Sequence, residues 1–132
     1  MPTLVDSSVW IDFFRGIRNR QSEYLSSKLG EAEFVIGDLI LTEVLQGFRT
    51  ERDFRDARKA LLSFEVHRIV GEGNAIQSAI HYRYLRDHGY AISKTIDYWI
   101  ATFCLANDFQ LLHSDTDFDP FERLLGLRVI HP

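Results

Sequence analysis

Four acidic residues stand where a carboxylate could do chemistry. Asp6 ends a short apolar run near the N-terminus, and Asp115 follows another apolar run near the C-terminus. Glu43 interrupts an otherwise apolar helical segment, while Asp97 falls in the first turn of a predicted helix. Clustered carboxylates repel one another unless a cation joins them, and hard oxygen ligands favour Mg²⁺ or Mn²⁺. If the four side chains meet, they predict a divalent metal site that could activate water against a phosphodiester.

Each of these acids also has a purely structural explanation. Asp is favoured where the chain turns into a helix, which would account for Asp6. A first-turn position lets Asp97 complement the helix dipole, and Glu43 could lie on the solvent edge of its helix. Asp115 and Asp117 belong to a polar loop, and such loops are often acidic without function. The case for a metal site therefore depends on the joint pattern of the four acids.

Short apolar segments alternate with amphipathic segments along the whole chain. The apolar segments predict five strands, at residues 3–5, 34–36, 65–70, 110–113 and 127–130. The segments between them predict helices at about residues 8–14, 21–29, 39–49, 51–63, 71–87 and 95–107, with a short helix capped by Asp119 ahead of Pro120. This alternation predicts a three-layer α/β/α sandwich with a short, about five-stranded parallel sheet.

The predicted strands suggest how two of the acids could meet. A central parallel strand is buried on both faces and leaves little room for a charge along its length. At its carboxyl end, however, a charge lies at the mouth of the sheet, where open α/β folds bind ligands. If the first and fourth strands are neighbours, Asp6 and Asp115 face each other across that crevice.

Length and composition indicate a single domain spanning residues 1–132, with 45% hydrophobic residues to form a core. No apolar run approaches the roughly 18 residues that would span a bilayer, and the N-terminus does not resemble a signal peptide. The single cysteine, Cys104, excludes an internal disulfide and suits a reducing compartment. We therefore expect a cytoplasmic protein with no membrane association. The net charge of −4 argues against nucleic-acid binding by bulk charge, but it does not exclude a nuclease.

Four motifs carry a family resemblance. They are Asp6-Ser7-Ser8-Val9-Trp10-Ile11-Asp12, Thr42-Glu43-Val44-Leu45-Gln46-Gly47, Thr95-Ile96-Asp97-x-x-Ile100-Ala101 and Leu111-Leu112-His113-Ser114-Asp115-x-Asp117-Phe118. In order and spacing the chain resembles PIN-domain ribonucleases, and most closely the VapC-type toxins of bacterial type II toxin–antitoxin pairs. Single motifs of this kind are weak, but four in order over about 110 residues are specific.

The resemblance implies a Mg²⁺-dependent endoribonuclease, with Mn²⁺ as an alternative ion, that cuts RNA with a metal-activated water. The family's four catalytic acids fall on Asp6, Glu43, Asp97 and Asp115. Asp6 and Asp97 would bind the metal directly. Glu43 and Asp115 would position the water or a second ion.

Three further residues are placed near this cluster by the same resemblance. Ser8 falls on the family's small hydroxyl residue and would hydrogen-bond within the cluster, and Asp117 would be an auxiliary acid. His113 departs from the family, because many relatives carry Thr or Ser there. It could line the site, but a strand-end histidine bonded to the backbone is the favoured interpretation.

The resemblance implies three partners: an RNA substrate, a small cognate antitoxin and a second copy of the chain. Arg15, Arg18 and Arg20 flank the end of the first helix, where guanidinium groups could contact phosphates. The basic residues of segment 49–59 could also follow an RNA backbone, although interleaved acids make a solvated face with local ion pairs at least as plausible. Tyr82, Tyr98 and Trp99 could serve self-association or belong to the core.

Other activities of similar sheets fit the sequence less well. A receiver domain needs an acid pair after the first strand, a phospho-acceptor aspartate on the third strand and a late lysine, and these are not present together. A phosphatase of the haloacid dehalogenase type needs Asp-x-Asp after the first strand, where position 8 is serine. A catalytically inactive PIN-like module that binds RNA or protein remains the alternative.

Overall fold

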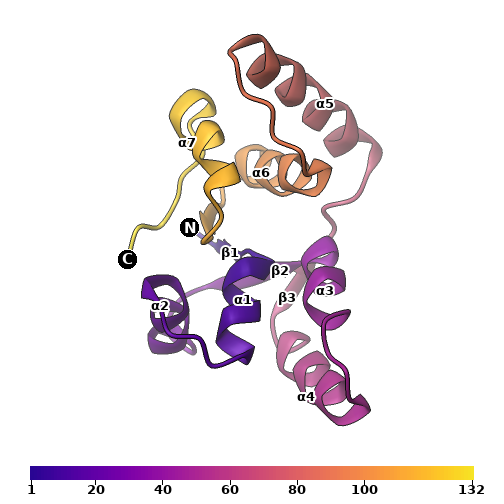
Figure 1. Cartoon of the computed structure of the whole chain (residues 1–132), viewed down its shortest axis with the longest axis vertical. Helices are drawn as coiled ribbons and strands as arrows, with labels where there is room; N and C mark the ends of the chain where they lie inside the picture. Colours follow the sequence, from indigo (N-terminus) through magenta and orange to yellow (C-terminus); the bar gives the residue numbers. More distant parts are fainter.

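A four-stranded parallel sheet forms the centre of the molecule (Figure 1). In the computed structural model, which describes all 132 residues, the strands are β1 (Thr3–Val5), β2 (Phe34–Gly37), β3 (Glu65–His67) and β4 (Gln110–Leu112). Their order is β3-β2-β1-β4. All residues of β1 and β2 are buried, as expected of parallel strands covered on both faces.

Helices cover both faces of the sheet. Those on one side are α1 (Ser7–Phe14), α2 (Arg20–Lys28), α3 (Asp38–Leu45) and α4 (Glu51–Leu61); those on the other are α5 (Glu72–Asp87), α6 (Thr95–Asn107) and α7 (Asp119–Leu125), with a 3₁₀ turn at Thr116–Phe118 (Figure 1). Right-handed crossovers explain this division. The chain moves in one direction from β1 to β3 and then returns past β1 to β4, which changes the face on which the connection lies.

The reversal of strand order lies between β1 and β4. The backbone N–H of Asp6 donates to the carbonyl of Leu112 at 2.9 Å, so the pairing of these strands continues to the first acid. Asp115 follows three residues after Leu112. The fold therefore brings the carboxyl ends of both strands together at the place where parallel α/β sheets bind ligands.

The predicted α/β sandwich is confirmed, with one strand fewer than expected. Segment 127–130 forms only a single bridge, between Val129 and Leu111. Hydrogen bonds flank it, from Leu111 N to the Arg128 carbonyl and from Ile130 N to the Leu111 carbonyl.

Several ends of elements differ from the sequence prediction. The helix predicted at 39–49 ends at Leu45, and the helix predicted at 51–63 ends at Leu61. The third strand stops at His67, and the next buried residue, Ile69, donates its backbone N–H to Asp38 Oδ1 at 2.9 Å instead of to a strand. The short C-terminal helix, α7, begins at Asp119, so Asp119 is its first residue and makes no capping bond. Asp115 instead caps the preceding 3₁₀ turn.

The core consists of one cluster that joins the sheet to both helical layers. Trp10 of α1 packs against Phe13, Phe14 and Phe64 on one side. On the other side Tyr98 of α6 is buried. None of the helices combines the length and the apolar composition that a bilayer crossing needs.

Candidate active site

Asp6 lies at the carboxyl end of β1 and is only 3% exposed. It is also the N-cap of α1, because its Oδ2 accepts hydrogen bonds from the backbone N–H and the hydroxyl of Ser8, at 3.1 and 2.6 Å. Burial raises the pKa of Asp6, although the bonds from Ser8 oppose this. The Ser8 hydroxyl also accepts from the backbone of Ser114 at 3.2 Å, which ties the end of β1 to the loop after β4.

Asp97 enters the same region from the first turn of α6. Its residue is 4% exposed, and its Oδ2 is buried without a hydrogen-bond partner. Burial, followed by the charge of Asp6, raises the pKa of Asp97 to about 7. A buried carboxylate oxygen with no partner costs free energy, which a cation beside it would recover.

Asp115 and Asp117 approach Asp97 from the loop after β4. One oxygen from each of the three carboxylates lies within 4.8 Å of the others. Asp115 Oδ1 accepts from the backbone of Asp117 at 2.9 Å. Burial tends to raise the pKa of Asp115, but hydrogen bonds from Lys94 and Asp117 outweigh it and hold that pKa below its usual range. Asp6, one of the two predicted direct metal ligands, does not belong to this group of three carboxylates. Asp117, predicted only as an auxiliary acid, does belong to it.

Lys94 is a functional candidate that the sequence analysis missed. Its Nζ lies 2.7 Å from Asp115 Oδ2 and 3.9 Å from the Oδ2 atoms of both Asp97 and Asp117. Lys94 is the N-cap of α6 but forms no capping bond. A cation opposes the dipole at a helix N-terminus, and lysine is not a favoured cap. This local misfit is the signal that could have found it.

Glu43 reaches the cluster from α3. It is half-buried, and its Oε1 accepts from the hydroxyl of Ser7 at 3.1 Å, so it faces α1 and not only the solvent. Burial and then the nearby charge of Asp6 raise the pKa of Glu43. The four acids predicted from sequence thus share one electrostatic environment.

His113 supports the loop that carries Asp115. Its Nδ1 accepts the backbone N–H of Asp115 at 3.1 Å, which assigns the proton of the neutral ring to Nε2. Burial lowers the pKa of His113, which favours the neutral ring. This is the strand-end histidine bonded to the backbone that the sequence analysis favoured.

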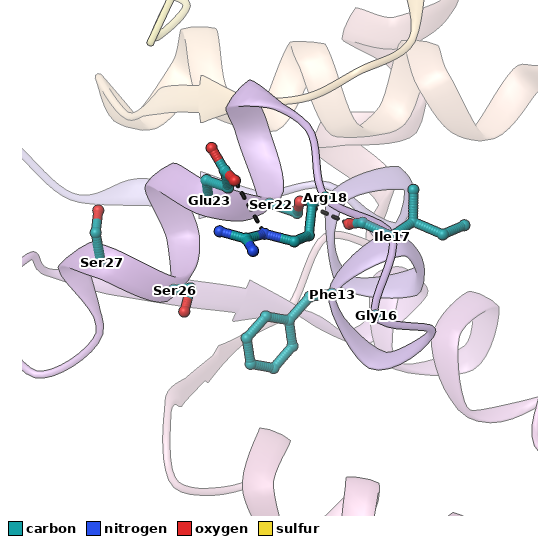
Figure 2. A pocket seen from close by; sticks show the side chains of 8 residues that line it. All are labelled: Phe13, Gly16, Ile17, Arg18, Ser22, Glu23, Ser26 and Ser27. Atoms are coloured by element: carbon teal, nitrogen blue, oxygen red, sulfur yellow. Dashed lines mark hydrogen bonds and ion pairs between the residues drawn. The ribbon is translucent and has the colours of Figure 1, made fainter.

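The predicted RNA-binding arginines lie at the other end of α1 from Asp6. Figure 2 shows Arg18 and Glu23 beside a hollow of about 500 Å³ between α1 and α2. Arg18 Nε donates to Glu23 at 3.1 Å, and both side chains are exposed. Arg15 and Arg20 are exposed as well. No acid of the cluster lines this hollow, so it is separate from the candidate active site.

The charged residues of α4 do not form the local ion pairs that were one interpretation of their spacing. No salt bridge within 4.0 Å joins Arg52, Arg55, Arg58 or Lys59 to an acid, and all four are exposed. Their role stays a prediction.

The donor set of the cluster suits a hard divalent cation. All of its ligating atoms are carboxylate oxygens, and the Asp97 oxygen has no other hydrogen-bond partner. Oxygen ligands with a small number of carboxylates fit Mg²⁺ and Mn²⁺, whereas a zinc site would draw on His or Cys.

Comparison with known families agrees with this geometry. Residues 3–124 match the PIN domain. The chain belongs to the PIN-domain family. The match includes all four predicted acids and Lys94, so the whole cluster lies inside the PIN domain.

Solved structures show the same fold at low sequence identity. FitAcB from Neisseria gonorrhoeae superposes with a TM-score of 0.76 at 18% identity, covering 98% of this chain and 97% of the other. VapBC2 from Rickettsia felis, bound to a promoter DNA fragment, gives 0.75 at 16% identity and 98% coverage of both chains. VapC20 from Mycobacterium tuberculosis, a sarcin-ricin loop cleaving toxin, gives 0.71 at 15% identity, covering 98% of this chain and 99% of the other. The structural neighbours of this PIN domain are thus toxins and their complexes.

Proposed function

We propose that this PIN domain is a Mg²⁺-dependent endoribonuclease and the toxin of a type II toxin–antitoxin pair. The proposal rests chiefly on the environment of the Asp97 carboxylate. A buried carboxylate with a pKa of about 7 and an unpartnered oxygen faces two further carboxylates at the carboxyl edge of the sheet. Lys94 offsets this arrangement only in part, so a bound divalent cation would stabilise it further, which is typical of a functional site.

The acids would divide the work by position. Asp6 and Asp97 would hold the ion, while Glu43 and Asp115 would orient water, with Asp117 beside them. A divalent ion bound here would lower the pKa of water and offset charge on a phosphodiester. Ser8 would keep Asp6 in place through its hydroxyl bond.

RNA cleavage tests the catalytic part of this proposal. Purified protein should cut a structured RNA pool with Mg²⁺ or Mn²⁺, and EDTA should abolish the cutting. Asp6→Asn and Asp97→Asn should each lower the rate by at least about a hundredfold, because each removes a charge from the metal site. Asp56→Asn is the matched control, since Asp56 is exposed on α4 and does not belong to the acidic cluster. Cutting that persists in EDTA or in both variants would indicate a contaminating nuclease and favour an inactive binding module.

Growth measurements test the toxin part. Induced expression of the wild-type chain should arrest growth of a bacterial host, whereas Asp97→Asn should not. A small DNA-binding protein encoded by a neighbouring gene should restore growth and form a complex with both versions, because an antitoxin recognises the folded surface. Arrest by the inactive variant would refute RNA cleavage as the cause.

A groove with apolar and charged walls is the candidate surface for the antitoxin. It has a volume of about 500 Å³ and lies between α1 and the end of α3, with Ile11, Phe14, Val44 and Phe48 as its apolar lining. Phe14 and Phe48 meet edge to face at 5.5 Å between ring centroids. Phe48→Asp should therefore weaken binding of the antitoxin without changing RNA cleavage by the free chain.

The second copy expected from the resemblance would use α5. Ile76 and Ile80 are 57% and 49% exposed and lie one helical turn apart. Tyr82 is also exposed, whereas Tyr98 is buried beneath it with ring centroids 5.1 Å apart and so belongs to the core. We expect a homodimer by light scattering and a shift toward monomer in Ile80→Asp.

A further inference from the structure

The ammonium group of Lys94 lies among the carboxylates of Asp97, Asp115 and Asp117, which belong to the candidate metal site. It is 2.7 Å from Asp115 Oδ2, where it donates a hydrogen bond, and 3.9 Å from Asp97 Oδ2 and from Asp117 Oδ2. These carboxylates each offer an oxygen to the group whose atoms lie within 4.8 Å of one another. One cation thus already neutralises part of the cluster in the chain alone.

Lys94 makes fewer hydrogen bonds to the three carboxylates than a purely structural ion-pair network would need. Only Asp115 is within hydrogen-bonding distance, and the buried Asp97 Oδ2 keeps no hydrogen-bond partner although it faces the ammonium group. The Lys94 side chain is 56% exposed, so it can leave the cluster without unfolding its surroundings. A doubly charged ion would satisfy the same oxygens more completely.

Lys94 also occupies a position where its charge is locally unfavourable. It is the N-cap of α6, where the N–H groups and the helix dipole attract anions. No side-chain capping bond compensates for this placement. The pull of the carboxylates is the one interaction in the structure that explains the orientation of this side chain.

We propose that Lys94 is an internal counter-cation that a divalent ion displaces, and that the released ammonium then contacts a phosphate of the RNA beside the ion. This inference rests on the proposed function. Lys94 carries three donors on a flexible stem, so it can exchange carboxylate partners for phosphate oxygens. The exchange keeps metal affinity low until the substrate supplies an anion for the displaced lysine.

Metal titration separates this role from a structural one. Calorimetry with Mn²⁺ at pH 8.0 would compare wild type with Lys94→Met and Lys94→Arg, since Asp97, with a pKa of about 7, is mostly ionised there. Lys94→Met should bind Mn²⁺ about two- to fivefold more tightly, the scale of a part-exposed ion pair. Lys94→Arg keeps the competing charge and should stay near wild type. Lys28→Met is the matched control, because Lys28 pairs with Glu31 beside α2 at 3.9 Å.

Cleavage kinetics test the second half of the exchange. Lys94→Met should raise KM for RNA several-fold more than it lowers kcat, because it removes a phosphate contact and leaves the acids intact. Lys94→Arg should restore KM.

The outcomes distinguish the two proposals. Mn²⁺ affinity that is unchanged or weaker in Lys94→Met overturns the displacement, even if wild type binds metal and cuts RNA. An unchanged KM overturns the phosphate contact. If no variant binds Mn²⁺, the proposed metal-dependent function fails together with this inference. Tighter metal binding with a higher KM, reversed by arginine, supports it.

Discussion

Replacing Asp97 with asparagine should stabilise the metal-free chain at alkaline pH. The pKa of Asp97 is about 7 in the folded chain because of burial and the charge of Asp6, against an ordinary value of 3.8. Between these values the folded chain keeps a proton that the unfolded chain has released. The free energy of unfolding therefore falls as pH rises through this window and levels off above pH 7. An asparagine side chain carries no charge at any pH and so would not contribute to this fall.

The size of the effect follows from the shift. A difference of about 3 pKa units corresponds to about 4 kcal/mol in total, at about 1.4 kcal/mol per unit. Most of the range between pH 3.8 and about 7 lies below pH 5.5, so between pH 5.5 and 8.5 the free energy of unfolding falls by only about 2 kcal/mol. For a chain of this length that is a change in Tm of roughly 6–10 °C.

Urea unfolding at pH 5.5 and 8.5, with EDTA present, measures this difference. The advantage of Asp97→Asn over wild type should grow by about 2 kcal/mol from the lower to the higher pH. His81 and His113, whose pKa values burial lowers, bias the wild-type curve the other way, so the difference between variants is the informative quantity. Asp56→Asn should follow wild type. An advantage that is equal at both pH values would refute the account of Asp97 as a buried carboxyl that charges at a cost.

Two further substitutions test the scaffold. Ser8→Ala removes the bonds to Asp6 and from Ser114, so it should lower the free energy of unfolding by about 1–2 kcal/mol in urea and slow RNA cleavage, whereas Ser27→Ala, at an exposed helix position, should do neither. Gly37→Ala would place a methyl group on the buried Ile69 side chain, and we expect a loss of about 1–3 kcal/mol in the same assay, with an unchanged stability contradicting the close approach.

The parts of the fold that could be predicted best are helices whose apolar residues recur at helical spacing over several turns. The helix Thr95–Asn107 was predicted with both of its ends, because its apolar residues recur over more than three turns. The terminal strand was predicted from an apolar run, but a strand also needs a partner, and this segment pairs with β4 at one position only. Local pattern cannot report how much edge is available for pairing.

The candidate site also contains residues that the sequence pattern could place and residues that it could not. Asp6 and Asp115 could be placed together from the sequence, because each follows a strand and carboxyl ends of parallel strands meet. Glu43 and Asp97 lie on helices, whose rotation toward the sheet no local pattern determines. Their positions in the sequence singled them out, but only the family resemblance gave them roles in the cluster. The bond from Ser7 and the burial of Asp97 are tertiary features.

Lys94 was missed because its partners are brought to it by the fold. The hydrogen bond to Asp115 spans 21 positions in sequence, across all of α6 and β4. The local sequence did contain a conflict, since a lysine stands where a helix prefers an oxygen acceptor and a negative charge. Such conflicts concentrate at functional sites, because a residue that serves its own helix badly persists when distant groups stabilise it. A search for residues that violate local preference could therefore find site residues that a search for acids alone does not.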